Sequence, residues 1–309
     1  MSLTSEPDLA SRRRPITDLR ATAKTRLGEK ADWVAITSDA VWIASFGPDA
    51  VQKLDPVTAA VTNVVQLPGK PLAGLALGFD ALWAPLCGDT PAIARIDLAT
   101  GSLAAVYRVP SVSAEGGVTT GAGSIWLAID DGRTLARIDP ATGAIQHRIK
   151  TPADSCNPLF HDGLVWLTCA GGNSVSIVDP GTNTIVSRLE TGPGPRFIGA
   201  SADSVWTLNQ GDGSLTRLDT RTRTVASTEQ LQTPGLGGDI AVGYGVVWTS
   251  VREVPLSAID ATTGRLLCQW KGAGGDSVGV GHGAIWLVHV RGGEVSRIDL
   301  QSALAQCRG

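Results

Sequence analysis

The sequence has no excess of basic residues and no long apolar run. It holds 26 Lys and Arg against 29 Asp and Glu, for a net charge of −3 at pH 7. Proteins that bind nucleic acids usually carry a basic stripe, so this balance argues against that class. The only basic run, residues 12–14, is expected to be a solvated tail. No window of about 18 consecutive apolar residues occurs, which argues against a membrane-spanning helix.

Signals for export and for common catalytic chemistry are missing as well. The first 20 residues contain no apolar stretch of the kind that a signal peptide needs. The sequence has no P-loop, no G-x-S-x-G nucleophile motif, no H-E-x-x-H zinc motif and no EF-hand loop. Its five Cys show no C-x-x-C spacing, which argues against a structural zinc site.

What the sequence does contain is a repeat of about 40 residues. An apolar residue followed by Trp occurs seven times, and successive Trp residues are 41, 43, 40, 40, 42 and 38 apart. The repeat Trp residues are Trp42, Trp83, Trp126, Trp166, Trp206, Trp248 and Trp286. An apolar residue followed by Asp comes 12 to 14 residues after each Trp, with Thr, or Ser in the last copy, three residues further on. Four short strands per unit at this period are typical of a propeller. The sequence therefore predicts an all-β, seven-bladed β-propeller with four antiparallel strands per blade.

Individual positions in the repeat have predictable structural roles. The repeat Trp residues should pack between neighbouring blades, and the Asp and Thr of each D-x-x-T segment should bond local backbone N–H groups. Residues 1–15 are expected to be a disordered polar leader, and 16–309 a single propeller. The segment 16–27 is expected to complete the blade of Trp286 as its outer strand, which would hide the last sheet edge. Residues 303–307 compete for the same place.

A candidate site follows from the hairpin formed by the first two strands of each blade. Positions about ten before and three after each repeat Trp should lie at the same end of the channel. Polar residues at this end are Asp32, Glu115, Arg196, Asn209, Asp239, Arg252, Asp276 and His289, with Trp33 and Phe197 as aromatic surface. Asp276 should lie opposite His289, and Arg196 opposite Asn209. An Asp–His pair there could orient a general base or support a metal. It could equally be a hydrogen-bonded pair that closes the channel.

The cysteines bear on the compartment. Cys156 and Cys169 should face each other across a hairpin, where a disulfide is feasible. Cys268 and Cys307 could meet only if the N-terminal strand closes the ring, and Cys87 has no obvious partner. Because cytosolic thiols stay reduced, a disulfide would indicate an oxidising compartment. We therefore expect an exported protein, periplasmic or secreted, whose signal is not part of this chain.

The repeat resembles the virginiamycin B lyase-like and YVTN-type seven-bladed bacterial propellers. The resemblance covers residues 16–309 and rests on the Trp strand, on R-I-D at 95–97, 137–139 and 297–299, and on D-P-x-T-(G/N) at 139–143 and 179–183. It implies the propeller fold. It also implies an enzymatic alternative, since the lyases use a magnesium-dependent site of His and Glu and the lactonases of similar architecture use calcium.

The expected function is binding rather than catalysis. The lyase branch typically carries P-H-G at inner-strand starts and W-F-T-E on the second strand, whereas here the residue three after each repeat Trp is never Glu. We expect a monomer that presents the channel mouth to a small molecule, glycan or protein. The alternative is a lyase or lactonase that depends on Mg²⁺ or Ca²⁺, with Asp276 and His289 as catalytic residues. The expected ligand-binding residues are Arg196, Asn209, Asp239, Arg252, Trp33 and Glu115.

Overall fold

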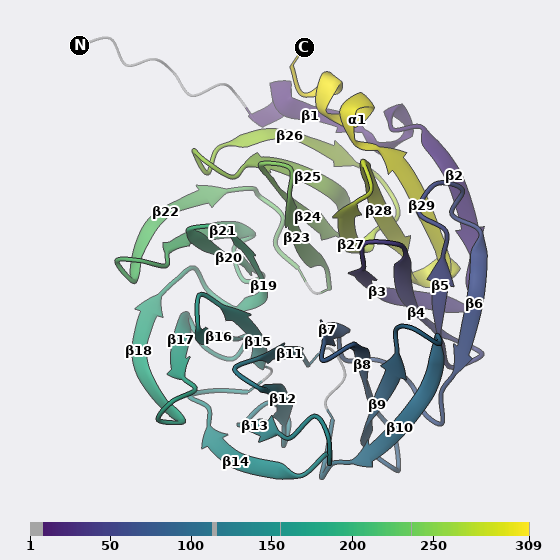
Figure 1. The fold of residues 1–309 in the computed structure, drawn as a ribbon. Helices are drawn as coiled ribbons and strands as arrows, with labels where there is room; N and C mark the ends of the chain where they lie inside the picture. Colours follow the sequence, from purple (N-terminus) through teal and green to yellow (C-terminus); the bar gives the residue numbers. More distant parts are fainter. Residues whose placement is uncertain (1–8, 113–115, 155, 236, 309) are drawn as a thin grey trace.

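The computed structural model describes residues 9–112, 116–154, 156–235 and 237–308. Seven sheets surround a central channel (Figure 1), which confirms the predicted seven-bladed β-propeller. Each blade has four antiparallel strands, placed one after another from the channel to the rim. One blade carries a fifth strand at its edge. No helix of the described part of the chain is long and apolar enough to cross a membrane.

The strands follow the chain blade by blade, with the inner strand first. Blade 1 contains β3 Lys30–Ile36, β4 Val41–Phe46, β5 Ala50–Leu54 and β6 Val61–Gln66. Blade 2 contains β7 Ala76–Gly78, β8 Ala81–Leu86, β9 Ala92–Asp97 and β10 Ser102–Arg108. Blade 3 contains β11 Val118–Gly121, β12 Ser124–Ile129, β13 Thr134–Ile138 and β14 Ile145–Lys150. Blade 4 contains β15 Cys156–His161, β16 Leu164–Cys169, β17 Ser174–Asp179 and β18 Thr184–Glu190.

The last three blades contain the seam of the ring. Blade 5 contains β19 Pro195–Ser201, β20 Ser204–Asn209, β21 Ser214–Asp219 and β22 Thr224–Gln230. Blade 6 contains β23 Asp239–Gly243, β24 Val246–Val251, β25 Val254–Asp260, β26 Leu266–Lys271 and, at its edge, β1 Arg13–Pro15. Blade 7 contains β27 Asp276–Gly281, β28 Ala284–His289, β29 Glu294–Asp299 and β2 Ala21–Arg26. The 3₁₀ helices are η1 Leu9–Arg12, η2 Ile16–Asp18 and η3 Val290–Gly292, and the one α-helix of the described residues is α1 Leu300–Gln306.

The second strand of each blade is almost entirely buried because neighbouring blades cover both of its faces. The repeat Trp residues have at most 1% of their surface exposed, which confirms that they are core residues. Most indole N–H groups donate to the end of the preceding inner strand, as from Trp83 to the Gly78 carbonyl at 3.0 Å. Burying the ring while satisfying its N–H explains why Trp occupies this position.

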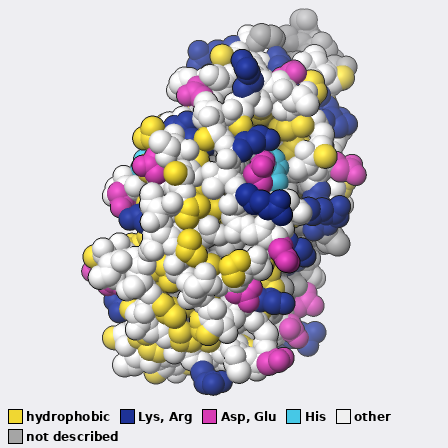
Figure 2. Space-filling model, turned by 90° about the vertical axis from the view of Figure 1, so that its right-hand side faces the viewer, with side chains coloured by type: hydrophobic (Ala, Val, Ile, Leu, Met, Phe, Trp, Pro, Cys, Tyr) yellow, Lys and Arg dark blue, Asp and Glu magenta, His cyan; other side chains and the backbone are white. Residues whose placement is uncertain are grey.

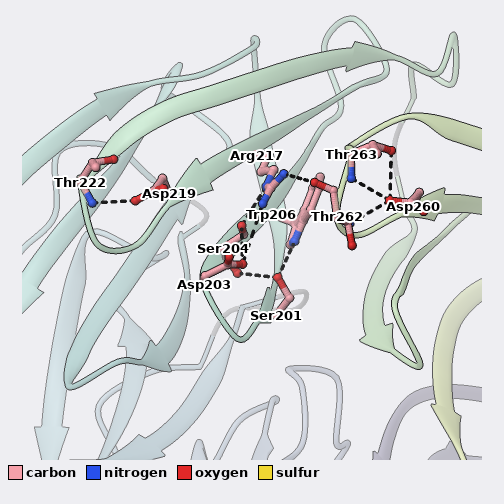
Figure 3. Close-up of polar contacts among 10 residues, drawn as sticks. All are labelled: Ser201, Asp203, Ser204, Trp206, Arg217, Asp219, Thr222, Asp260, Thr262 and Thr263. Atoms are coloured by element: carbon pink, nitrogen blue, oxygen red, sulfur yellow. Dashed lines mark hydrogen bonds and ion pairs between the residues drawn. The ribbon is translucent and has the colours of Figure 1, made fainter.

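The R-I-D segments, the equivalent R-L-D segment at 217–219 and the D-x-x-T motifs connect one blade to the next (Figure 3). The Arg217 guanidinium lies 5.4 Å from the Trp206 ring centroid and donates to the Thr262 carbonyl of the following blade. That carbonyl belongs to a turn in which Asp260 accepts from the Thr263 N–H at 2.7 Å. These backbone hydrogen bonds lower the pKa of Asp260. Arg137 and Arg297 reach the next blade in the same way, so the motifs specify inter-blade contacts.

The N-terminal strand closes the ring. β2 pairs antiparallel with β29, so it supplies the outer strand of blade 7, as expected for the segment 16–27. The competing segment, 303–307, is not a strand, because the chain turns into α1 directly after β29. Figure 1 shows β2, in purple, along the outer edge of β29, in yellow. Closing the ring in this way hides the edge that β29 would otherwise expose.

The leader expected over residues 1–15 is partly structured, which corrects that prediction. Residues 9–15 form η1 and β1, and β1 pairs in parallel with β26 on the edge of blade 6. The basic run is not a solvated tail, since Arg12 donates to the Leu266 carbonyl and Arg13 donates to Gln269 Oε1 at 3.0 Å. Polar composition did not predict this order because the strand is held by hydrogen bonds rather than by apolar burial.

Candidate functional site

A cavity of about 510 Å³ occupies the central channel. The inner strands of all seven blades contribute to its wall, and most of the side chains there are aliphatic. Three aromatic side chains, Trp33, Phe160 and Phe197, are part of the same wall. Among the described residues that line it, Asp239 is the one titratable side chain. Most of the described side chains in the channel wall are thus aliphatic or aromatic, and one of them, Asp239, carries a carboxyl group.

Asp239 begins β23 and is only partly buried. Its Oδ1 accepts from the Ile240 N–H at 2.7 Å, and its Oδ2 accepts from the Val278 N–H at 3.3 Å. Loss of solvent in the channel, reinforced by the nearby carboxylates of Asp32 and Asp276, raises its pKa to about 8. Two backbone hydrogen bonds do not offset this, so Asp239 is mainly protonated at neutral pH.

Trp33 lies in the channel as predicted and adopts an unusual backbone conformation. Its φ is +51° within a bulge of β3, between Asp32 and Val34. A bulky residue rarely adopts this left-handed conformation. The Trp33 N–H donates to Asp32 Oδ1 at 2.9 Å and to Ser277 Oγ at 3.0 Å, which holds it there. Strained residues of this kind concentrate at functional sites.

The Trp33 ring reaches across the channel. Its centroid lies 6.3 Å from that of Phe197, at an interplanar angle of 51°. Trp33 belongs to blade 1 and Phe197 to blade 5, so the inner strands of blades 6 and 7 lie between them around the ring. Two aromatic side chains from opposite parts of the ring therefore meet at the end where the inner strands begin.

Asp276 and His289 are directly opposite in the β27–β28 ladder, as the repeat count predicted. Their side chains nevertheless have other partners. Asp276 Oδ1 accepts from the Gly238 N–H at 2.6 Å. His289 Nδ1 accepts from the Gly275 N–H at 3.1 Å, and its Nε2 lies 2.9 Å from Ser296 Oγ.

These contacts fix the state of the imidazole. Because Nδ1 accepts a backbone N–H, the ring carries its proton on Nε2 and donates it to Ser296. Burial lowers the pKa of His289, which also favours the neutral ring. Burial raises the pKa of Asp276, although the Gly238 N–H and the charge of Arg252 oppose this. Both ring nitrogens are engaged within the protein, so the pair has the character of a structural closure rather than of an acid–base dyad.

Arg252 and His289 line a second cavity, of about 760 Å³, between blades 6 and 7. Lys271 and Arg291 line it too, together with the glycine-rich segment 272–275. Gly274 has φ +119°, and a Cβ there would lie 2.6 Å from His289 Nδ1, so only glycine fits beside the imidazole. The expected single site is thus divided: Asp239 and Trp33 face the channel, whereas Arg252 and His289 face the side cavity.

The predicted pairing of Arg196 with Asn209 is wrong. A bulge at the start of β19 places Pro195, not Arg196, opposite Asn209. Asn209 is fully buried inside blade 5, and its Nδ2 donates to Ser214 Oγ and to Thr216 Oγ1, both at 2.9 Å. The Arg196 guanidinium lies 6.0 Å from the Phe197 ring centroid. Glu115 lies outside the described residues.

Asn157 is a channel residue that the repeat count passed over. It lines the cavity from β15 with only 5% of its surface exposed. Its Nδ2 donates to the Arg196 carbonyl at 3.0 Å, but its Oδ1 makes no hydrogen bond with any described residue. Its position, nine residues before Trp166, matches that of Asp239 before Trp248. This equivalence with Asp239 could have identified Asn157 as a channel residue from the sequence.

The carboxylates do not form a metal centre within the described residues. No group of three or more His, Cys, Asp and Glu side chains there is arranged to hold a metal ion. The Mg²⁺ or Ca²⁺ of the enzymatic alternative therefore has no fitting ligand set among them. On the side of the molecule seen in Figure 2, Lys and Arg are interspersed with Asp and Glu, without a broad field of one sign.

Two disulfides are present in the described part of the chain. Cys156 and Cys169 are joined across the β15–β16 hairpin, and Cys268 and Cys307 join β26 to the end of α1. The second bond forms because the N-terminal strand takes the outer place in blade 7 and leaves the C-terminus free to cross to blade 6. Cys87 is a free thiol, and burial raises its pKa to about 11.

Comparison with solved structures confirms the fold. The structure of selenomethionine-substituted virginiamycin B lyase from Staphylococcus aureus superposes with a TM-score of 0.74 at 17% identity, over 90% of this chain and 98% of that one. A streptogramin B lyase structure gives 0.73 at 16% identity, over 89% and 96% of the two chains. BamB from Moraxella catarrhalis gives 0.63 at 11% identity, over 91% and 99%. No protein family profile and no curated protein sequence matches the chain. The chain is therefore similar to the virginiamycin B lyases in fold.

Proposed function

We propose that this propeller binds a small molecule in its central channel. The observation that carries the proposal is the cavity of about 510 Å³, in which Asp239 is the one carboxyl group among described side chains that are mostly aliphatic or aromatic. Ligand sites are commonly cavities of roughly 300–1,000 Å³ with apolar walls and a few polar groups that orient the ligand. Keeping Asp239 in such a wall costs solvation free energy that a bound ligand can offset.

The backbone of Trp33 supports the same site. Its left-handed conformation costs roughly 1–3 kcal/mol, and it places the ring in the channel opposite Phe197. In this proposal Trp33 and Phe197 contact the apolar part of the ligand, and Asp239 contacts its polar part. Catalysis by Asp276 and His289 is not part of the proposal, because both imidazole nitrogens have partners within the protein.

We also propose that the protein works in an oxidising compartment, as an exported protein. The two disulfides support this, since structural disulfides persist outside the reducing cytosol. The check is thiol labelling of denatured protein that was purified without reductant. Labelling of Cys87 alone agrees with export, whereas labelling of all five cysteines contradicts it.

The channel proposal is tested by a thermal-shift screen of small molecules against three proteins. Val242→Trp fills the channel from β23, and Val225→Trp places the same side chain on an exposed outer position of β22. A ligand at about 100 times its Kd adds roughly 2.7 kcal/mol of stability. We expect shifts in the parent and in Val225→Trp, and none in Val242→Trp. Ligand shifts that persist in Val242→Trp, with the fold verified by circular dichroism, would refute the channel site.

A further inference from the structure

We infer that the channel ligand carries a protonated amine, with its ammonium group held by the Asp239 carboxylate and its apolar body against the ring of Trp33. This inference rests on the proposed function of the channel and names the class of its ligand. It predicts an amine with a mainly apolar body, since most of the cavity wall is aliphatic or aromatic.

The sign of the charges around Asp239 is the first argument. The inner strands of three adjacent blades bring Asp32, Asp239 and Asp276 near one another. The charges of Asp32 and Asp276 help to raise the pKa of Asp239. No Lys, Arg or His is among the described residues that line the channel. Arg252 and Arg291 act on Asp276, and both line the side cavity instead. A cation entering the channel would therefore meet the Asp239 carboxyl, with no basic side chain among the described lining residues to repel it.

Asp239 is the carboxylate that can serve a ligand. Asp32 Oδ1 is engaged by the Ser277 hydroxyl and the Trp33 N–H, and Asp276 Oδ1 by the Gly238 N–H. Both of these side chains are more than nine-tenths buried. Asp239 is the member of the three that is part of the cavity wall. Asp32 and Asp276 therefore act on the ligand only through their electrostatic field, and Asp239 is the carboxylate that can contact it.

The polar and aromatic groups of the wall suit the same ligand. An ammonium has only donors, and the Asp239 carboxylate supplies acceptor oxygens for it in the wall of the cavity. Trp33 and Phe160 line the cavity and offer aromatic surface to the apolar body of the amine, whereas the buried Phe197 ring already lies 6.0 Å from the Arg196 guanidinium. A carboxylate or phosphate ligand would instead face acceptor groups and a carboxylate, and would be repelled.

Binding of the amine releases the proton of Asp239 to the solvent. In the empty channel at neutral pH Asp239 is mainly the neutral acid, because its pKa is about 8. When R–NH₃⁺ binds, the Asp239 O–H bond breaks, the carboxylate remains in the ion pair, and the proton goes to the solvent. Affinity should therefore rise nearly tenfold per pH unit as the pH approaches 8, and the increase should level off above it.

The test compares each amine with its neutral counterpart. Benzylamine is paired with benzyl alcohol and hexylamine with hexanol, and binding is measured by isothermal titration calorimetry at pH 6, 7 and 8. The proteins are the parent, Asp239→Asn, and Asp89→Asn as a control at an exposed carboxylate. We expect the parent to bind an amine at least tenfold more tightly than its alcohol at pH 8. We expect that preference to vanish in Asp239→Asn and to persist in Asp89→Asn.

The outcomes separate this inference from the proposed function. Titration in buffers of different ionisation enthalpy should show close to one proton released per amine at pH 6. Alcohols that bind as tightly as amines, or an unchanged preference in Asp239→Asn, would overturn the amine class and leave the channel as a site. If the screen finds neutral ligands and neither amine binds, the amine class is likewise overturned and the channel remains a site. Absence of binding by every compound would overturn the channel site itself.

Discussion

Replacing Asp239 by Asn is expected to change how the stability of the protein depends on pH. The pKa of this carboxyl is about 8 in the folded protein, against about 3.9 in an unfolded chain. Between these values the folded state retains a proton that the unfolded state has lost. The free energy of unfolding should therefore fall as pH rises through this window, and the contribution should level off above pH 8.

The size of the effect follows from the displacement of the pKa. One pKa unit corresponds to about 1.4 kcal/mol, so the full displacement predicts a loss on the order of 3–4 kcal/mol between pH 5 and pH 8. Asp239 is only partly buried, and water that enters the channel screens its charge. After that screening we expect a difference of roughly 1–3 kcal/mol.

Denaturant titrations at pH 5, 6, 7 and 8 measure this contribution when the parent and Asp239→Asn are compared. The difference between the two curves cancels other titrating groups. These include His289, whose lowered pKa gives a stability contribution that rises with pH. Asp89→Asn, at an exposed position, controls for removal of one charge. Parallel curves for the parent and Asp239→Asn would show that the carboxyl is solvated, and the reasoning about the channel would fail.

Three further outcomes test other parts of the structure. Cys268→Ser opens a disulfide that spans 39 residues, so denaturation should show a loss of up to about 4 kcal/mol, and reductant, which also opens Cys156–Cys169, should destabilise the parent by at least as much. Gly274→Ala should lower the melting temperature more than Gly235→Ala does, because both have positive φ but only the first Cβ meets another side chain. Deleting residues 1–26 removes β2 and exposes the edge of β29, so light scattering should reveal aggregation that the full chain does not show.

The fold was predictable because each blade repeats the same local requirements. Trp206 must be buried between blades, Arg217 must lie over its ring, and Asp260 must close the next turn. The buried Trp and the turn Asp recur in all seven copies, and a Lys or Arg lies over the Trp ring in four of them, so the pattern is visible as a period in the sequence. The structured part of the leader, residues 9–15, was missed because it has no repeat and little apolar content.

The site was only partly predictable because the repeat sets strand register and not side-chain partners. Counting from the Trp placed Asp276 opposite His289 correctly. It could not show that Gly238 and Gly275 provide their hydrogen bonds, since these come from backbone of neighbouring loops. A bulge is equally invisible to counting, and one bulge was enough to place Arg196 out of register with Asn209.

The closure of the ring determines the order in which the chain can fold during its synthesis. β2 is synthesised before blades 1 to 6, whereas its partner β29 is synthesised after them. At about 5–20 residues per second, β2 waits roughly 15–60 s for that partner. Blades 1 to 6 can form their four antiparallel strands in the meantime, whereas blade 7 is completed only when β29 has been made. A nascent chain with an unpaired β2 is therefore a necessary stage in the life of every molecule.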